Sequence, residues 1–269
     1  MPQALSQFIS AIERADSASA LSDAVQDLAD AGLFEAAPHL IEALSYNNPG
    51  AAVAAVDGLV KLGEPTVPAL LEQLDLHNYT ARAWAIRALA SIGDPRGLLT
   101  LLGAATADIS MSVRRAAARG LGNMQWHQFP HHFLAIAQSE ALEALLFVAQ
   151  QDEEWVVRYA GVVGLESLGL ASRSGDRASR SQIESQLALM AEQEASPAVR
   201  ARIWQAQQRL QAEPSQPTAS PVESPLLSST DWEQILNRLY DRKLKERATV
   251  GAGDPFSDRN LLSTGSQQS

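Results

Sequence analysis

Residues 81–95 read ARAWAIRALASIGDP, and this stretch recurs in altered form along the chain. Alanine, leucine and isoleucine return in it at intervals of three and four, so one face of an α-helix is apolar. A glycine and an aspartate–proline pair then stop one helix and begin the next. Similar stretches lie at 51–65, 112–124, 156–169 and, more weakly, 198–210. Helix pairs that repeat in this way cannot bury their own apolar faces singly, so they stack on one another.

The sequence therefore predicts an all-α fold, a solenoid of HEAT-like helix pairs. One repeat position should pack between helices, and it holds Leu59, Leu89, Leu121 and Leu165. Asparagine–proline at 48–49 and aspartate–proline at 94–95 predict helix starts. Four glycines predict left-handed helix ends, Gly32, Gly63, Gly93 and Gly169. The expected helix pairs run over 17–44, 49–74, 78–105, 109–149 and 155–193, with a last helix at 196–211.

Beyond the solenoid, which we place at residues 1–211, the composition changes. Residues 212–229 are rich in proline and serine and predict a flexible linker. Residues 230–247 predict an amphipathic helix that opens with a capping box and carries its acids before its bases. Residues 248–269 predict a disordered tail. A tethered amphipathic helix normally docks, either on its own solenoid or on a partner.

Composition disfavours several classes of protein. The 269 residues include no cysteine, which excludes disulfides, thiolate metal sites and thioether-linked groups on this chain. The net charge is −10, and residues 1–75 hold two basic against eleven acidic residues, which argues against nucleic acid as a partner. No apolar run approaches the roughly 20 residues of a membrane span, and the N-terminus lacks the order of a signal peptide. We therefore expect a soluble, cytoplasmic protein without membrane insertion.

Arginines occupy two kinds of position in the repeats. The first kind flanks the apolar face and predicts a ladder that bridges neighbouring repeats. Its members are Arg82, Arg114, Arg158 and Arg200.

The second kind of arginine points away from the core, toward the expected concave side, and lies there with an acid and a tyrosine. These residues are Asp57, Arg87, Arg115, Arg119 and Tyr159. Because guanidinium groups suit carboxylates, they predict a groove for an anionic ligand or a partner, although a solvated face with incidental ion pairs has the same pattern. Trp84 and Trp155 are expected to pack in the core or between repeats.

An insertion at 125–132, QWHQFPHH, interrupts the repeat. Its histidines could suggest a metal site, but Pro130 breaks the one pair with helical spacing, His127 and His131, so we predict no metal. Functional residues concentrate in loops, which makes Trp126 and His127 candidates for contact with a ligand or partner. No nucleophile–base motif, P-loop or dinucleotide fingerprint is present, and we expect no covalently bound cofactor.

Four stretches, taken in order, resemble the HEAT-repeat phycobilin lyases of cyanobacteria. They are NNPGAAVAAVDGL (47–59), NYTARAWAIRALASIGDPRGL (78–98), SVRRAAARGLGNMQW (112–126) and EEWVVRYAGVVGLESL (153–168). The stretch DWEQILNRLYDRKLKER (231–247) is similar as well. The resemblance is closest to the F-type subunits of heterodimeric phycocyanobilin lyases that act on the phycocyanin α subunit.

The resemblance implies a function. Such lyases work as an E-type and F-type pair, bind phycocyanobilin as substrate, and deliver it to a cysteine of the phycocyanin α subunit, where a thioether forms. The pair can also catalyse the reverse reaction or a transfer. Related pairs include lyase–isomerases whose F-type subunit is associated with a His–Cys motif, and the absence of cysteine disfavours that activity. An alternative from another class is a non-catalytic HEAT scaffold that binds phycobiliproteins during phycobilisome assembly or degradation.

Roles for the candidate residues follow from this resemblance and from the groove. The candidate bilin-binding residues are Arg87, Arg115, Arg119, Trp126 and His127, and the candidate catalytic residues are Asp57 and Tyr159. We expect the arginines to hold the bilin propionates. Asp57 would accept pyrrole N–H bonds or supply a proton, and Tyr159 would stack on a ring. The sulfur that attacks the bilin would belong to the substrate protein, so the lyase need supply only binding, orientation and a proton donor.

Overall fold

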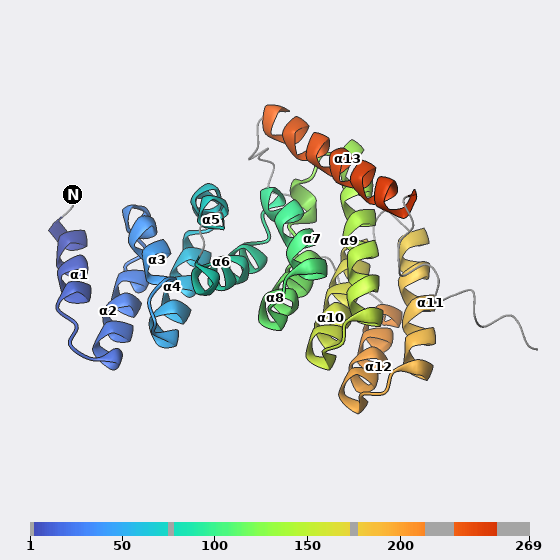
Figure 1. Ribbon diagram of the computed structural model, residues 1–269, viewed down its shortest axis with the longest axis horizontal. Helices are drawn as coiled ribbons and strands as arrows, with labels where there is room; N and C mark the ends of the chain where they lie inside the picture. The colour runs from blue at the N-terminus through green and yellow to red at the C-terminus, as the bar shows by residue number, and fades with distance from the viewer. Residues whose placement is uncertain (1–2, 75–77, 173–176, 213–228, 252–269) are drawn as a thin grey trace, which may run out of the picture. The chain divides into compact units, whose positions relative to one another are not determined.

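The computed structural model describes residues 3–74, 78–172, 177–212 and 229–251. They fall into two units, Met1–Glu223 and Ser224–Ser269. The first unit contains the helices α1 (Gln3–Glu13), α2 (Ala18–Asp30), α3 (Ala37–Ala43), α4 (Pro49–Leu62), α5 (Val67–Gln73), α6 (Tyr79–Ile92), α7 (Leu98–Ala107), α8 (Met111–Gly122), α9 (His131–Gln151), α10 (Trp155–Ala171), α11 (Arg177–Gln193) and α12 (Pro197–Gln211). Short 3-10 turns join some of them, η1 (Phe34–Ala36), η2 (Glu64–Thr66), η3 (Pro95–Gly97) and η4 (Trp126–Gln128). The described residues contain no strand, which confirms the predicted all-α solenoid (Figure 1).

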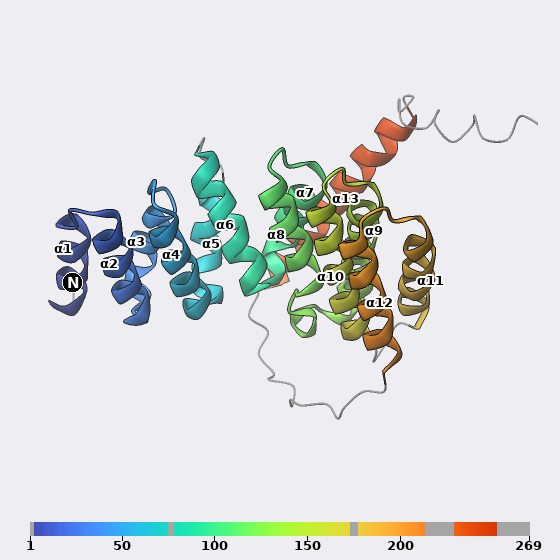
Figure 2. The same cartoon turned by 90° about the horizontal axis from the view of Figure 1, so that it is seen from below.

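The first unit is a stack of helix pairs in two layers. In one layer the even-numbered helices from α2 to α12 lie side by side in chain order, as Figure 2 shows. Each odd-numbered helix packs more extensively on the helix that follows it than on the one before it, as with α7 on α8 and α9 on α10. The predicted helix positions are therefore right, but the predicted pairing was wrong by one helix. The predicted pairs began at residue 17, so they joined α2 to α3, whereas α2 packs more extensively on α1, a helix that was not predicted, than on α3.

The helix boundaries follow the predicted signals. The Asn48 side-chain oxygen accepts the N–H groups of Gly50 at 3.0 Å and Ala51 at 3.2 Å, which caps α4 ahead of its first-turn proline. Three of the predicted glycines have positive φ, Gly32 at 62°, Gly63 at 71° and Gly93 at 71°. Residues with a side chain rarely adopt this conformation, so these glycines end their helices as expected.

Gly169 was predicted wrongly as a helix end. It lies inside α10, where an added Cβ would come within 2.8 Å of the Leu210 side chain of α12. Its small size serves close packing between helices rather than chain reversal. A second close approach joins α8 and α10, since a Cβ at Gly122 would lie 2.5 Å from the Cα of Gly164. The even-numbered layer is thus held together at backbone distance in its C-terminal half.

Helix α9 differs from what the sequence led us to expect. Helix α9 is long and apolar enough to cross a membrane by length and composition alone, although the sequence led us to expect no apolar run of that size. Its inner face is buried in the stack, including Phe133, Ala137 and Leu145. The core helix of a soluble protein passes the same test, so α9 adds no argument for a membrane.

The second unit contains α13 (Ser229–Gly251) among its described residues. This confirms the predicted C-terminal helix and extends it by four residues beyond the expected end at 247, into the segment predicted as tail. The rest of the predicted linker, 213–228, and of the predicted tail, 252–269, lies outside the described residues.

Candidate functional site

A cavity of about 440 Å³ lies between α6 and α8 in the first unit. Three of the predicted groove residues line it, Arg87 on α6 and Arg115 and Arg119 on α8. The other described residues that line it carry no charge, and Trp84 is the largest of them. The volume lies within the range of small-molecule sites, roughly 300–1,000 Å³. The cavity therefore offers three positive charges without an internal counter-charge.

Small side chains create the cavity at the contact of the two helices. A Cβ on Gly120 of α8 would lie 2.5 Å from the Cβ of Ala90 on α6, so the helices touch at this level. Both residues belong to the cavity lining, which also includes Ala83 and Ala116. The floor is thus tight and apolar, and the longer arginine side chains stand around it.

The arginines of the cavity are open. Arg87, Arg115 and Arg119 are all exposed. Within the described ranges, no side chain forms an ion pair or hydrogen bond with the guanidinium of Arg115 or Arg119. The Arg87 guanidinium carbon lies 5.4 Å from the centroid of the Trp84 ring, a cation–π distance. These groups remain available for an external anion.

The guanidinium groups of the neighbouring ladder arginines are already paired with side chains of adjacent repeats. Arg114, directly before Arg115, pairs through its Nε with Asp152 Oδ2 at 2.7 Å and is only 11% exposed. Its Nη1 also donates to the Asp108 carbonyl oxygen at 2.9 Å. Arg82 pairs with Asp108 at 3.0 Å, and the predicted ladder between repeats is confirmed at these positions.

The ladder continues toward the C-terminus. Arg158 pairs with Glu194 at 2.8 Å, and this hydrogen bond holds the pKa of the Glu194 carboxyl below its ordinary value. Arg200 closes the series differently, because its guanidinium donates to the carbonyl oxygens of Glu194 and Ala195. Consecutive arginines in α8 therefore have opposite uses, one inside the ladder and one in the cavity.

A second cavity, of about 520 Å³, continues the first toward the starts of α6 and α8. The two cavities share Ala83, Trp84 and Ser112, and the second also reaches Thr80 and Ser110. We call the two together the α6–α8 groove. Helix α8 rises about 1.5 Å per residue, so the stretch from Ser110 to Asn123 gives the groove a length of roughly 20 Å.

Comparison with known proteins identifies the family. A model of HEAT repeats matches residues 67–166, which include both walls of the groove. The phycocyanobilin lyase subunit beta of Pseudanabaena tenuis is 57% identical over 267 residues, covering 95% of each chain. The chain belongs to the phycocyanobilin lyase β-subunit family. The family resemblance predicted from the sequence is thereby confirmed.

Other members of the lyase family are also similar. The phycocyanin alpha phycocyanobilin lyase CpcF of Synechocystis is 44% identical over 61% of this chain and 76% of its own length. In the solved complex of CpcE and CpcF of phycocyanin lyase from Nostoc sp. PCC7120, one chain is 48% identical, with a TM-score of 0.59 over 64% of this chain and 98% of that chain. The phycobilisome maturation protein of Synechococcus elongatus is 46% identical over 77% of this chain and 98% of its own.

Four of the residues that we assigned to the lyase site do not line the α6–α8 groove. Asp57 is exposed on α4, one helix before it. Tyr159 lies on α10, where the Arg202 guanidinium carbon is 5.9 Å from its ring centroid. Trp126 is only 7% exposed and its ring lies 5.2 Å from that of Phe129, so it packs under the loop. His127 is exposed in η4. Their expected roles toward a bilin remain predictions.

Trp84 is the groove residue that sequence reasoning missed. We expected it to pack, and it does pack partly on the hydrophobic core. The same side chain also lines both cavities of the groove. A signal was present in the sequence, because Trp84 precedes Arg87 by three residues and so shares its helix face.

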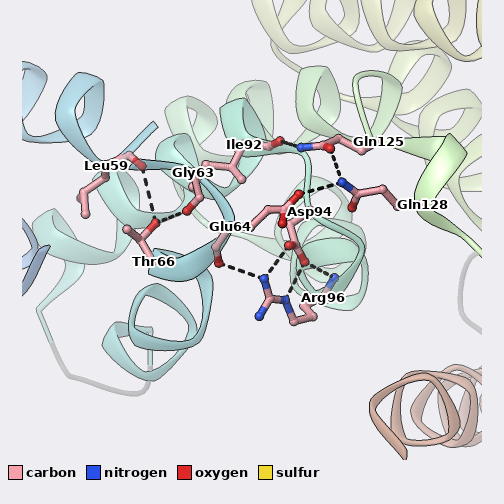
Figure 3. Close-up of polar contacts among 9 residues, drawn as sticks. All are labelled: Leu59, Gly63, Glu64, Thr66, Ile92, Asp94, Arg96, Gln125 and Gln128. Atoms are coloured by element: carbon pink, nitrogen blue, oxygen red, sulfur yellow. Dashed lines mark hydrogen bonds and ion pairs between the residues drawn. The ribbon is translucent and has the colours of Figure 1, made fainter. Parts of the chain in front are cut away.

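The insertion that contains Trp126 connects three repeats (Figure 3). The Gln125 side chain donates to the Ile92 carbonyl oxygen at 2.8 Å, and the Gln125 backbone N–H donates to the Gly93 carbonyl oxygen at 2.8 Å. Gln128 donates to Glu64 Oε1 at 2.7 Å, across 64 positions in the chain. The side chains of the two glutamines also bond to each other. The insertion thus fixes α8 to the ends of α4 and α6.

Arg96 reinforces the same junction. Its Nη2 donates to the Glu64 carbonyl oxygen at 2.9 Å and pairs with Asp94 Oδ2 at 2.6 Å, as Figure 3 shows. The walls of the groove therefore belong to repeats that are cross-linked at the C-terminal ends of α4, α6 and α8. No three His, Cys, Asp or Glu side chains gather as a metal site would require anywhere in the ranges described.

Proposed function

We propose that the chain acts as the F-type subunit of a heterodimeric lyase in the cytoplasm. With an E-type partner it would attach phycocyanobilin through a thioether to a cysteine of the phycocyanin α subunit, and it would also catalyse the reverse reaction or a transfer. The CpcE–CpcF complex of the Nostoc relative supports an E-type partner. The name of the Synechocystis relative supports phycocyanin α as the acceptor.

The observation that carries the proposal is the groove with three open arginines and no carboxylate in its lining. A bilin has two propionate groups, and guanidinium groups bind carboxylates through paired, planar hydrogen bonds. The chain has no cysteine, so the sulfur must come from the acceptor protein. Addition of a thiol across a conjugated double bond of the bilin needs neither an oxidant nor a leaving group. The task of this subunit is then to bind and orient the bilin.

Reconstitution tests the proposed activity. Co-expression with an E-type subunit, bilin synthesis and the phycocyanin α subunit should give a covalent, red-absorbing product. Omission of this chain should abolish that product. Equal attachment with and without the chain would instead favour the non-catalytic scaffold.

Arginine substitutions test the site. Arg87→Ala and Arg119→Ala should each weaken bilin binding by the purified pair about tenfold or more, since a charge-assisted hydrogen bond contributes about 1.5–3 kcal/mol. Arg14→Ala, an exposed arginine before α2, removes the same charge and should leave binding unchanged. Binding is titrated by absorbance without phycocyanin, after pair formation has been checked. Wild-type bilin binding with failed docking of the α subunit would make the groove a protein-binding surface.

A further inference from the structure

Trp84 lies at the middle of the α6–α8 groove. Together with Ala83 and Ser112 it forms the wall that the two cavities share. The side chain is partly buried against the hydrophobic core, which fixes the place of the indole. The Arg87 guanidinium carbon, 5.4 Å from the ring centroid, orders the indole further. The groove therefore presents a pre-positioned aromatic side chain beside its open arginines.

We infer that Trp84 is the stacking surface of the bilin site, so that the conjugated face of the tetrapyrrole lies on the indole while its two carboxylates bind the groove arginines. This inference rests on the function proposed above and adds the residue that holds the conjugated system. It transfers to Trp84 the stacking role that the sequence had suggested for Tyr159. An indole offers a large flat apolar face, and little conformational entropy is lost when it is already packed.

The register of the two helices supports this arrangement. Arg115 and Arg119 are four residues apart on α8, which separates them by about 6 Å along the helix axis. The equivalent leucines of the repeat, Leu89 and Leu121, place Arg87 on α6 level with Arg119. Facing helices in contact have axes roughly 8–10 Å apart. The positive charges therefore stand at two heights and on two walls, with the aromatic side chain one turn before Arg87.

That pattern suits a conjugated dianion. The two propionate arms of an open-chain tetrapyrrole can reach both heights at once while one of its rings lies on Trp84. A compact anion such as inorganic phosphate would use the arginines and gain nothing from the indole. The two cavities together give the conjugated system of the bilin room along the groove, which is roughly 20 Å long by the helical rise of 1.5 Å per residue. Dependence on Trp84 is thus the property that separates bilin binding from simple anion binding.

Titration of the purified pair with phycocyanobilin tests the inference. Absorbance measures binding, and quenching of tryptophan fluorescence reports which indole lies near the bilin. Trp84→Ala should weaken binding about tenfold, because the stacking contact between the indole and the conjugated system is lost. Trp84→Phe should keep most of the affinity but lose a large part of the quenching. Trp204→Ala, which removes a 56% exposed tryptophan on α12, is the matched control and should leave affinity unchanged.

The dimethyl ester of phycocyanobilin separates stacking from charge. Its binding should be weaker, should no longer depend on Arg119, and should still fall with Trp84→Ala. Equal affinities of Trp84→Ala and Trp204→Ala, or full quenching in Trp84→Phe, would overturn the stacking role. A wild-type pair that binds bilin yet forms no covalent product would overturn the proposed function instead. Trp84→Phe preserves most of the packing, so the test stands even where Trp84→Ala does not fold.

Discussion

The N-terminal and C-terminal repeats join their helices by different chemistry. At the start of α4, Asn48 caps the helix and its amide nitrogen donates to the Ala18 carbonyl oxygen of the preceding repeat at 2.7 Å, so the joint is neutral. At the start of α10, the N-cap residue Glu154 makes no side-chain cap. Instead Asp152 accepts the Glu154 N–H at 3.0 Å and pairs with Arg114 of the preceding repeat. Neighbouring repeats are therefore joined by a neutral hydrogen bond at α4 and by an ion pair at α10.

The change from one solution to the other occurs at the groove. Helix α6 has both devices, since Asn78 caps it and Arg82 pairs with Asp108. In α4 the position equivalent to Arg82 is Ala52, which cannot form an ion pair. The open arginines thus begin where the paired ones begin. Paired arginines fix the helices, so the open ones next to them keep a defined geometry for a ligand.

Breaking the ionic joint should have the largest effect on stability. Arg114→Ala leaves the Asp152 carboxylate, whose side chain is only 8% exposed, without its partner. We therefore expect a loss of about 3–5 kcal/mol in the free energy of unfolding. Arg115→Ala, the next residue, is the control, because an exposed and unpaired side chain should change stability by less than about 0.5 kcal/mol. Urea unfolding followed by circular dichroism measures both. Similar losses for the two variants would contradict the division between ladder and groove.

Breaking the neutral joint should have a smaller effect. Asn48→Ala removes a helix cap and a hydrogen bond between repeats, so we expect a loss of about 1–2 kcal/mol. Its neighbour Asn47 is exposed, and Asn47→Ala should be close to neutral. The same urea experiment compares them. If Asn48→Ala cost as much as Arg114→Ala, the two joints would be equally strong and the contrast would be only chemical.

Lowering the pH should weaken the ionic joint but not the neutral one, and we expect this to be the smallest of the three effects on stability. The bond from Arg158 lowers the pKa of Glu194 from its ordinary value of 4.5, so the unfolded chain takes up the proton first as the pH falls. The stabilisation from this group is fully present well above pH 4.5 and is lost as the pH falls through the lowered folded pKa. The difference in thermal stability between wild type and Glu194→Gln should therefore narrow as the pH falls from about 6 to below 4.5. The difference between wild type and Asn48→Ala should stay constant, because that joint has no titrating group.

Local signals in the sequence predicted most of the fold. The leucine positions and the asparagine–proline pair located the helices because they act within one or two turns. Gly169 was misread because its role depends on Leu210, which lies 41 positions later in the chain, on α12, and packs against it. A glycine that ends a helix and one that admits a neighbour look alike until that neighbour is known.

The repeat alignment predicted which helix face each candidate residue lies on, but it did not predict which of these residues line the same groove. Alignment of the repeats put Arg87 and Arg119 on one face, and the structure brings them together in the groove. The same alignment could not show that Asp57 and Tyr159 lie outside its lining, since the gap between α6 and α8 depends on the small residues at their contact. Trp126 seemed accessible from its place in an insertion, but the loop folds over its own aromatic neighbours.

The bond between Gln128 and Glu64 also bears on how the protein unfolds. Repeat stacks are held by contacts between neighbours, so their ends can open while the middle stays folded. This bond passes over a whole repeat and, with Gln125 and Arg96, connects the ends of α4, α6 and α8. Those three repeats should then open as a single cooperative unit, and their protected amide hydrogens should report one common free energy of opening. The groove would be complete or absent, with no half-formed state in which a bilin could bind in the wrong register.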